Sequence, residues 1–302
     1  TRLKLTKRLR EFNSYLVHTY AGRKIVHFAV NEAESKIRRR VRVMMKPPDF
    51  MSYPRETYWR LPEGRLIVDG RNWLDDLARH LGNYSISKKR RLGNKNSRTT
   101  MYVLKRGSDE YKIAVKELAK SKALKWTMVG LWNEPVKRFR MDPLLRIGSE
   151  YKAIRYMRSI GLRTPIIEAV VLNRKLLVTR FVDGITLADA IRDYIRGKVE
   201  ASFLIRKAGA EIAKIHIAGA TLGNIKPKHI IVNENDLYFT NVEQFMLNAG
   251  DPAWDVAQFI SWGLKSTRNS KMAAIITKEF VEGYMSVGDS SNILSISKGK
   301  RY

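Results

Sequence analysis

The sequence contains no cysteine, and this absence excludes several kinds of site. Without a thiol among its 302 residues, the chain has no disulfide framework, no thiolate zinc site and no cysteine nucleophile. Chains without cysteine are compatible with a reducing compartment, and a cytoplasmic location is therefore the expectation.

Long apolar segments are missing too. No run of about 18 apolar residues occurs; the nearest candidate, residues 246–264, carries Asp251 and Asp255. A membrane-spanning helix is therefore not expected. The basic start of the chain, TRLKLTKRLREF, lacks the apolar run of a secretory signal.

Acidic residues are scarce relative to basic ones. The chain has 29 Asp and Glu against 57 Lys and Arg, a formal net charge of +28. Such an excess points to a polyanionic partner, either nucleic acid or an anionic membrane surface. The alternative is a solvated basic surface with no dedicated partner.

The positive charge is concentrated toward the start of the chain. The net charge is +15 over residues 1–100, +10 over residues 101–200 and +3 over residues 201–302. Aromatic residues interleave with the early basic runs, where they either stack on unpaired bases or pack in a core. The side chains expected to contact nucleic acid lie in the three densest basic runs: Lys36, Arg38, Arg39, Arg40, Arg42, Lys88, Lys89, Arg90, Arg91, Lys137, Arg138 and Arg140.

From about residue 86 the pattern predicts an ordered series of elements. An amphipathic helix is expected over residues 147–160, ended by Gly161, and Thr186 is a candidate N-cap. An irregular insert containing Pro135 and Pro143 is expected between the strand at 111–118 and the helix at 147–160. Strands are expected at 86–91, 99–105, 111–118, 166–172, 175–182, 229–232 and 237–240, and further helices at 73–81, 187–194, 202–218, 254–264 and 271–285.

This order of elements resembles the two-lobed protein-kinase fold, and more narrowly the small atypical kinases of the RIO type and the kinase subunit of the KEOPS complex. The stretch GDPAWDVA also resembles aminoglycoside phosphotransferases. The resemblance covers about residues 85–265 and implies an α+β fold. It divides the chain into a basic N-terminal region (1–84), a β-rich small lobe (85–182) and a mainly helical lobe (183–302).

The resemblance assigns nucleotide-binding roles in the small lobe. Lys116, in IAVK, matches the strand lysine that pairs with ATP phosphates, and Glu150 matches the helix glutamate that holds this lysine. Gly93 and Ser97 match the loop that covers the phosphates, although Lys95 replaces one of its glycines. ATP with magnesium is therefore a candidate cofactor, although none is certain.

The same comparison identifies degenerate positions in the helical lobe. Asn224 stands where the catalytic aspartate is expected, His229 at the metal-binding asparagine and Asn241 at the magnesium-binding aspartate. Asparagine has no carboxylate to act as a base, and neutral amide or imidazole ligands bind magnesium weakly. These replacements indicate a pseudokinase. Two routes to activity stay open: Glu243 as a substitute metal ligand, or phosphate binding by Lys226 and His229 without metal.

Three functions follow from these patterns. The first is a catalytically impaired kinase-like protein that binds nucleic acid through its basic N-terminal part, with RNA favoured over DNA and a ribosome or other ribonucleoprotein as the setting. The second is an active atypical serine/threonine kinase or ATPase. The third is a peripheral membrane protein held by basic patches, a partner that is less expected than nucleic acid.

Overall fold

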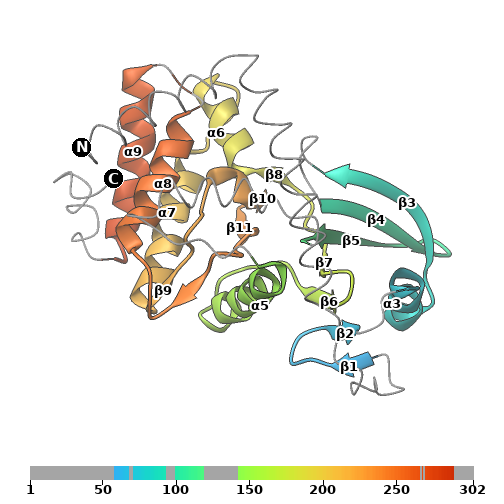
Figure 1. Cartoon of the computed structure of the whole chain (residues 1–302). Coiled ribbons are helices and arrows are strands. Elements are labelled where there is room, and N and C mark those ends of the chain that lie inside the picture. Colours follow the sequence, from blue (N-terminus) through green and yellow to red (C-terminus); the bar gives the residue numbers. More distant parts are fainter. Residues whose placement is uncertain are drawn as a thin grey trace, which may run out of the picture. The chain divides into compact units, whose positions relative to one another are not determined.

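The computed structural model describes residues 58–67, 71–92, 99–118, 142–265, 267 and 269–288. They fall within the unit that spans Glu56–Tyr302 and form a β-sheet lobe and a helical lobe (Figure 1). The expected α+β, two-lobed kinase-like fold is thus confirmed. Residues 1–57 of the basic N-terminal region lie outside the described residues.

One seven-stranded sheet forms the first lobe, in the order β1-β2-β6-β7-β5-β4-β3. Neighbouring strands are antiparallel except β2 and β6, which are parallel. The strands are β1 (Tyr58–Arg60), β2 (Arg65–Ile67), β3 (Ser85–Leu92), β4 (Thr99–Arg106), β5 (Asp109–Glu117), β6 (Ile167–Val171) and β7 (Leu176–Arg180).

Residues 58–82, from the N-terminal region of the sequence, contribute to this sheet and its core. β2 pairs with β6, and the helix α3 (Trp73–Gly82) follows. Ile67 and Leu77 are fully buried in one cluster with Leu104 and Val178 of the later strands. This segment therefore shares a hydrophobic core with strands from much later in the chain. The predicted helix at 73–81 is present, and Asn83 terminates it in a left-handed conformation.

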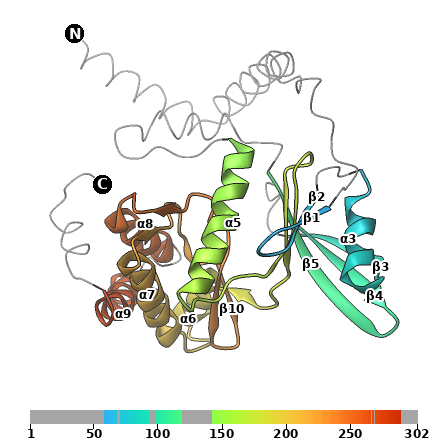
Figure 2. The ribbon, with the colours of Figure 1, turned by 90° about the horizontal axis from the view of Figure 1, so that it is seen from below.

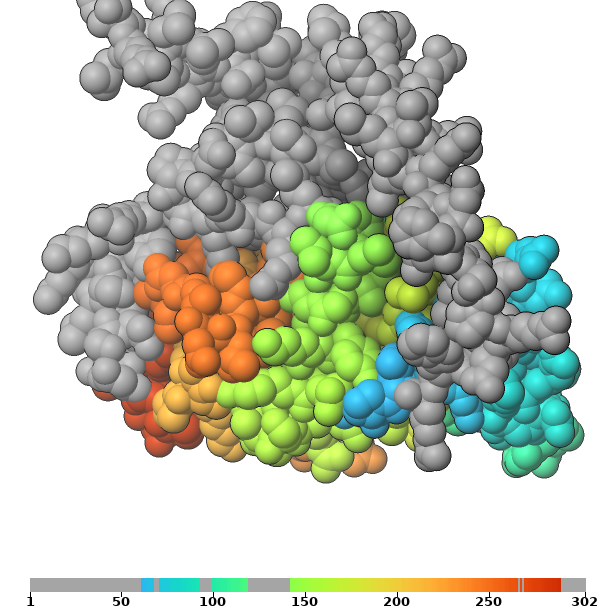
Figure 3. Space-filling view, turned by 60° about the horizontal axis from the view of Figure 1, so that its bottom comes forward, coloured from blue at the N-terminus to red at the C-terminus, as the bar shows by residue number. Residues whose placement is uncertain are grey.

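The helix α5 (Pro143–Ser159) lies between the strands and the C-terminal helices (Figure 2). It begins earlier than the expected helix at 147–160, and Pro143 belongs to it rather than to the irregular insert. Asp142 caps it by accepting a hydrogen bond from the Leu145 amide at 2.9 Å. Proline suits the first turn, where its missing N–H has no helical partner anyway. The space-filling view shows the α5 segment at the surface (Figure 3).

The second lobe is mainly helical, with short strands in two small sheets. Thr186 caps α6, as predicted, by accepting a hydrogen bond from the Asp189 amide at 3.1 Å. Among the described residues no helix is long and apolar enough to cross a bilayer. The elements are β8 (Ile185–Thr186), α6 (Leu187–Ile195), α7 (Ser202–Ile217), β9 (Ala220–Thr221), the 3-10 turn η1 (Pro227–His229), β10 (Ile230–Asn233), β11 (Asp236–Phe239), β12 (Met246–Leu247), α8 (Pro252–Leu264) and α9 (Ser270–Met285).

Two glycines allow α7 and α9 to pack with their backbones in close contact. A Cβ added at Gly209 would overlap the backbone of Phe280, and one added at Gly283 would overlap the carbonyl of Arg206. The neighbouring atoms are backbone, which cannot rotate out of the way. Phe280 and Tyr284 are fully buried beside this contact, so the core of the helical lobe depends on it.

We expect Gly283→Ala to destabilise the chain by about 1–3 kcal/mol or more, because overpacking forces two helices apart. Gly148→Ala is the matched control: Gly148 is exposed in α5, with no atom within 4 Å of an added Cβ. That change should stabilise by about 0.5–1 kcal/mol through higher helix propensity. Chemical denaturation of both variants measures the difference. Equal effects would show that the close α7–α9 contact is not required.

Candidate functional site

Lys116 and Glu150 meet in the structure as the resemblance implied. Lys116 lies on β5 and Glu150 on α5, and the Lys116 Nζ is 2.6 Å from the Glu150 Oε2. Both side chains are largely buried, and Glu150 is 4% exposed. A buried ion pair of this kind fixes α5 against the sheet, because either charge alone would be costly to desolvate.

A second carboxylate, from Glu243, contacts the same lysine. Its Oε2 lies 3.3 Å from the Lys116 Nζ and 2.7 Å from the Arg146 Nη2. Glu243 follows β11 by four residues and is 5% exposed. Lys116, Arg146, Glu150 and Glu243 together form what we call the buried charge cluster, with two positive and two negative side chains.

The protonation of the buried charge cluster follows from its geometry. Burial lowers the pKa of Lys116, but attraction to Glu150 and Glu243 outweighs burial and raises the pKa above its usual value. Burial likewise favours a neutral Glu243, yet Lys116 and Arg146 hold the pKa of that carboxyl below its usual range. For Glu150, burial and the nearby Glu243 charge raise the pKa. The pKa shifts of Lys116 and Glu243 thus both favour the charged forms of these two side chains.

Arg146 was not singled out from the sequence. It lies four residues before Glu150, a spacing that places both on one face of α5. This spacing was a usable signal, but it does not reveal that Glu243, 97 residues away, would accept a hydrogen bond from Arg146. Ser149 in the same turn donates a hydrogen bond to the Phe245 carbonyl at 3.0 Å, so α5 is held to the segment after β11 at two places.

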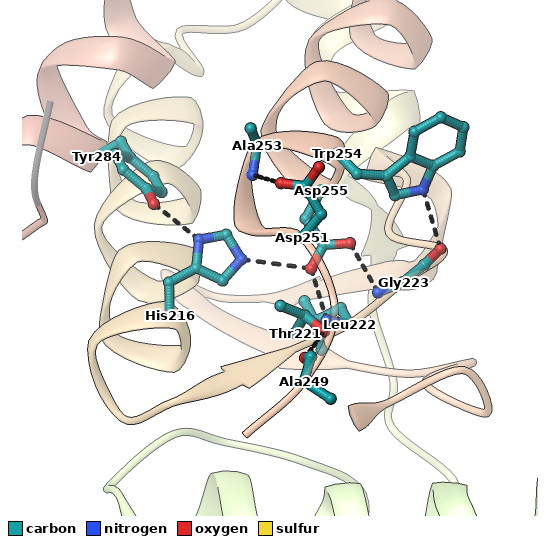
Figure 4. Close-up of polar contacts among 10 residues, drawn as sticks. All are labelled: His216, Thr221, Leu222, Gly223, Ala249, Asp251, Ala253, Trp254, Asp255 and Tyr284. Atoms are coloured by element: carbon teal, nitrogen blue, oxygen red, sulfur yellow. Dashed lines mark hydrogen bonds and ion pairs between the residues drawn. The ribbon is translucent and has the colours of Figure 1, made fainter. Parts of the chain in front are cut away.

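Asp255 fixes the loop that follows β9, in which Asn224 lies (Figure 4). Its carboxylate is fully buried and accepts hydrogen bonds from the amides of Leu222 and Gly223, at 2.6 and 2.7 Å. His216 lies 3.3 Å from the same carboxylate. Asp255 of α8 therefore holds the backbone of this loop in place.

Two further hydrogen bonds hold the same loop (Figure 4). The indole of Trp254 donates to the Gly223 carbonyl at 3.2 Å, and Thr221 donates to the Ala249 carbonyl at 2.9 Å. On the far side of His216, its Nδ1 lies 2.8 Å from the Tyr284 hydroxyl. The backbone of the loop is thus fixed although position 224 carries an asparagine where a carboxylate was expected.

His229 is buried and neutral. It is 7% exposed, and its Nδ1 lies 3.0 Å from the Asn224 carbonyl oxygen. A carbonyl can only accept, so Nδ1 carries the proton. Burial, together with the positive charges of Lys226 and Lys228, lowers the pKa of His229 to about 3. The imidazole therefore acts as a structural link across the loop.

The residues at the metal-binding positions do not suit magnesium. Asn241 is exposed, with a left-handed φ of 59°, and supplies only an amide oxygen. The Glu243 carboxylate is already paired with two cations. In the part of the chain that the structure describes, no three His, Asp or Glu side chains are grouped to hold a metal. Magnesium prefers oxygen ligands, usually including carboxylates, and this donor set does not supply them.

Of the basic residues expected to contact nucleic acid, four are described. Lys88, Lys89, Arg90 and Arg91 lie on the edge strand β3 and are exposed. Alternation along a strand sends neighbouring side chains to opposite faces, and Lys89 lies over the Tyr102 ring at 5.5 Å. The remaining candidates, at positions 36–42 and 137–140, and the loop residues Gly93 and Ser97 lie outside the described residues.

Among the comparisons with known proteins, a curated relative supports the resemblance to protein kinases. No protein-family model matches the sequence. Over 170 residues the chain is 27% identical to the probable serine/threonine-protein kinase BUD32 homolog of Archaeoglobus fulgidus, a match covering 54% of this chain and 80% of that protein. Among solved structures, the chain is similar to WaaP in complex with acyl carrier protein, with 11% identity, a TM-score of 0.43, and coverage of 78% of this chain and 97% of that one. The resemblance to the protein-kinase-like superfamily is confirmed.

The depressed pKa of His229 makes stability sensitive to acid. Since the folded value of about 3 lies below the unfolded value of about 6.5, the unfolded chain binds more protons between these limits. Stability should therefore fall as the pH drops below about 6.5, by up to ~1.4 kcal/mol per pH unit from this group. His229→Gln should flatten that part of the profile.

Denaturant titrations at several pH values test this expectation. The control is His80→Gln, which removes a histidine that is exposed on α3. If the His229→Gln profile stayed parallel to that of the unmodified chain, the buried neutral state of His229 would be refuted.

Proposed function

We propose that this protein-kinase-like chain does not transfer phosphate and instead serves as a nucleic-acid-binding module, with RNA the favoured partner. One observation carries the first half: the lysine expected to hold ATP phosphates is already paired with two carboxylates of the chain itself. Lys116 contacts Glu150 and Glu243 at 2.6 and 3.3 Å.

Glu243 opposes nucleotide binding in two ways. A phosphate approaching Lys116 would have to displace the Glu243 carboxylate, which loses an ion pair in a buried setting. If Glu243 stayed, its negative charge would face the phosphate within a few ångströms, where repulsion between like charges is strong. Arg146 holds Glu243 in place at 2.7 Å, so this carboxylate is not free to swing aside.

The chemistry expected of the loop is missing as well. Asn224 replaces the acid that orients the attacking hydroxyl, and an amide is a poor base. Asn241 and the neutral, buried His229 replace two magnesium ligands. Loss of the base and the metal ligands together removes most of the electrostatic stabilisation on which phosphoryl transfer depends.

The charge distribution supports the second half of the proposal. The net charge of +28 is carried almost entirely by residues 1–200, and Lys88 to Arg91 present four exposed cations on one edge strand. Such a surface gains free energy from phosphate contacts by releasing counterions. Preference for RNA over DNA rests on the resemblance to kinases of the RIO and KEOPS types.

An active kinase is the alternative, and it is favoured by the likeness to a probable serine/threonine-protein kinase. Incubation with labelled ATP and Mg²⁺ or Mn²⁺ separates the two. We expect phosphate transfer and hydrolysis no higher than those of Lys116→Met. The combined variant Asn224→Asp, His229→Asn, Asn241→Asp and Glu243→Gly restores the missing groups, and we expect ATP to raise its melting temperature but not that of the unmodified chain.

Turnover in the unmodified chain that Lys116→Met abolishes would overturn the pseudokinase half. A thermal shift by ATP in the unmodified chain, lost on Lys116→Met, would show that nucleotide binding has been retained. The combined variant serves as the positive control, because a response there shows that the assay detects nucleotide when the site can accept it.

Binding to a single-stranded RNA should weaken steeply between about 50 and 200 mM salt, with a log–log slope of about −0.7 for each phosphate contacted. Lys88→Ala and Arg90→Ala should each make the slope shallower by about 0.7. Fluorescence anisotropy measures both. Salt-independent binding, or binding only to anionic vesicles, would contradict the nucleic-acid half and favour the peripheral-membrane alternative.

A further inference from the structure

Three lysines surround one tryptophan at the C-terminal end of α8. The ammonium groups of Lys265, Lys226 and Lys228 lie 3.5, 4.2 and 5.3 Å from the centroid of the Trp262 ring. We call these four residues the lysine–tryptophan cluster. Trp262 is partly exposed, and Lys228 and Lys265 are exposed, so the cluster can be reached from solvent.

Local packing brings the four side chains together. Lys226 and Lys228 flank Pro227, whose Cγ would lie 3.9 Å from a Cβ added at Gly263. The turn η1 therefore packs against α8 directly beside Trp262. Lys265 follows the last residue of α8. Two separate segments thus direct their lysines to the same ring.

This arrangement concentrates positive charge. Each pair of ammonium groups is separated by less than about one Debye length, ~10 Å at 0.1 M salt, so their repulsion is only partly screened. The negative face of an indole offsets part of that repulsion. Within the described residues, neither Lys228 nor Lys265 forms an ion pair with a carboxylate. A bound anion would relieve the repulsion between Lys228 and Lys265.

We propose that the lysine–tryptophan cluster binds single-stranded nucleic acid, with the lysines on phosphates and an unpaired base stacked on Trp262. This inference rests on the proposed nucleic-acid function and gives that function a site in the helical lobe. The flexible lysine stems can exchange the ring for phosphate oxygens, which bind an ammonium more strongly than an aromatic face does. The ring face that a lysine leaves then accepts a base, a contact that tolerates any sequence.

The chemistry of the cluster favours nucleic acid over a lipid surface. Membrane-surface helices bury a broad apolar face, whereas α8, which the structure describes in full, has none of the well-exposed large apolar residues of the chain. One aromatic ring among three cations matches the alternating flat bases and charged phosphates of a single strand. The low net charge of residues 201–302, +3, makes this local concentration distinct from the general basicity of the chain.

Binding of a fluorescent oligouridylate to the full chain tests the proposal. Trp262→Ala should weaken binding about 5- to 150-fold, the range expected from losing one stacked base, and Trp262→Phe should lose less. Lys228→Ala should make the salt slope shallower by about 0.7. Lys152→Ala, which removes an exposed lysine from α5, is the control for charge alone and should have a smaller effect.

Two further measurements keep the outcomes distinct. Ultraviolet crosslinking to uridine, followed by peptide mass spectrometry, should label the peptide that contains Trp262, and melting curves should show that each variant is folded. If the unmodified chain binds RNA but Trp262→Ala and Lys228→Ala bind equally well without this crosslink, the site is refuted and the proposed function stands. If the unmodified chain binds no RNA, both fail. If the variants lose binding to phosphatidylserine vesicles and not to RNA, the site is a lipid contact and the proposal is overturned.

Discussion

Four charged side chains meet inside the protein, and three separate segments depend on their being paired. Lys116 comes from β5, Arg146 and Glu150 come from α5, and Glu243 comes from the segment after β11. An isolated buried charge costs several kcal/mol, while a balanced set of two cations and two carboxylates offsets much of that cost. The positions of β5, α5 and the segment after β11 are therefore linked: displacing one segment leaves charges on the others without partners.

The balance of charges in this cluster also bears on nucleotide binding. In a site that binds a nucleotide, part of the negative charge opposite the lysine is supplied by the ligand's phosphates. Here Glu243 supplies it from the chain, and its pKa is held low by Lys116 and Arg146. The ion pairs that link the two lobes are thus also the contacts on which the proposed loss of nucleotide binding rests.

The hydrogen bonds that hold the loop after α7 do not depend on which side chains stand at positions 224 and 241. Asp255 still accepts hydrogen bonds from two loop amides, and His216 still contacts Asp255. None of these contacts requires a carboxylate at position 224 or 241. A loop held this firmly can present other side chains, and Lys226 and Lys228, which follow Asn224 within four residues, contact Trp262.

The sequence by itself determined the order and kind of the elements and the pairing of Lys116 with Glu150. Apolar periodicity, Gly161 and the Thr186 cap are local signals, and the structure reproduces the elements they predicted between residues 85 and 285. Local signals were less informative about where a helix begins: Asp142 and Pro143 start α5 earlier than its apolar pattern suggested.

Only the tertiary structure decided that Glu243 reaches Lys116 and Arg146, and that three lysines from two segments meet at Trp262. These contacts join residues far apart in the chain, and their distances depend on how β5, α5, η1 and α8 pack. Periodicity and spacing report which face a side chain occupies, but not what lies opposite that face.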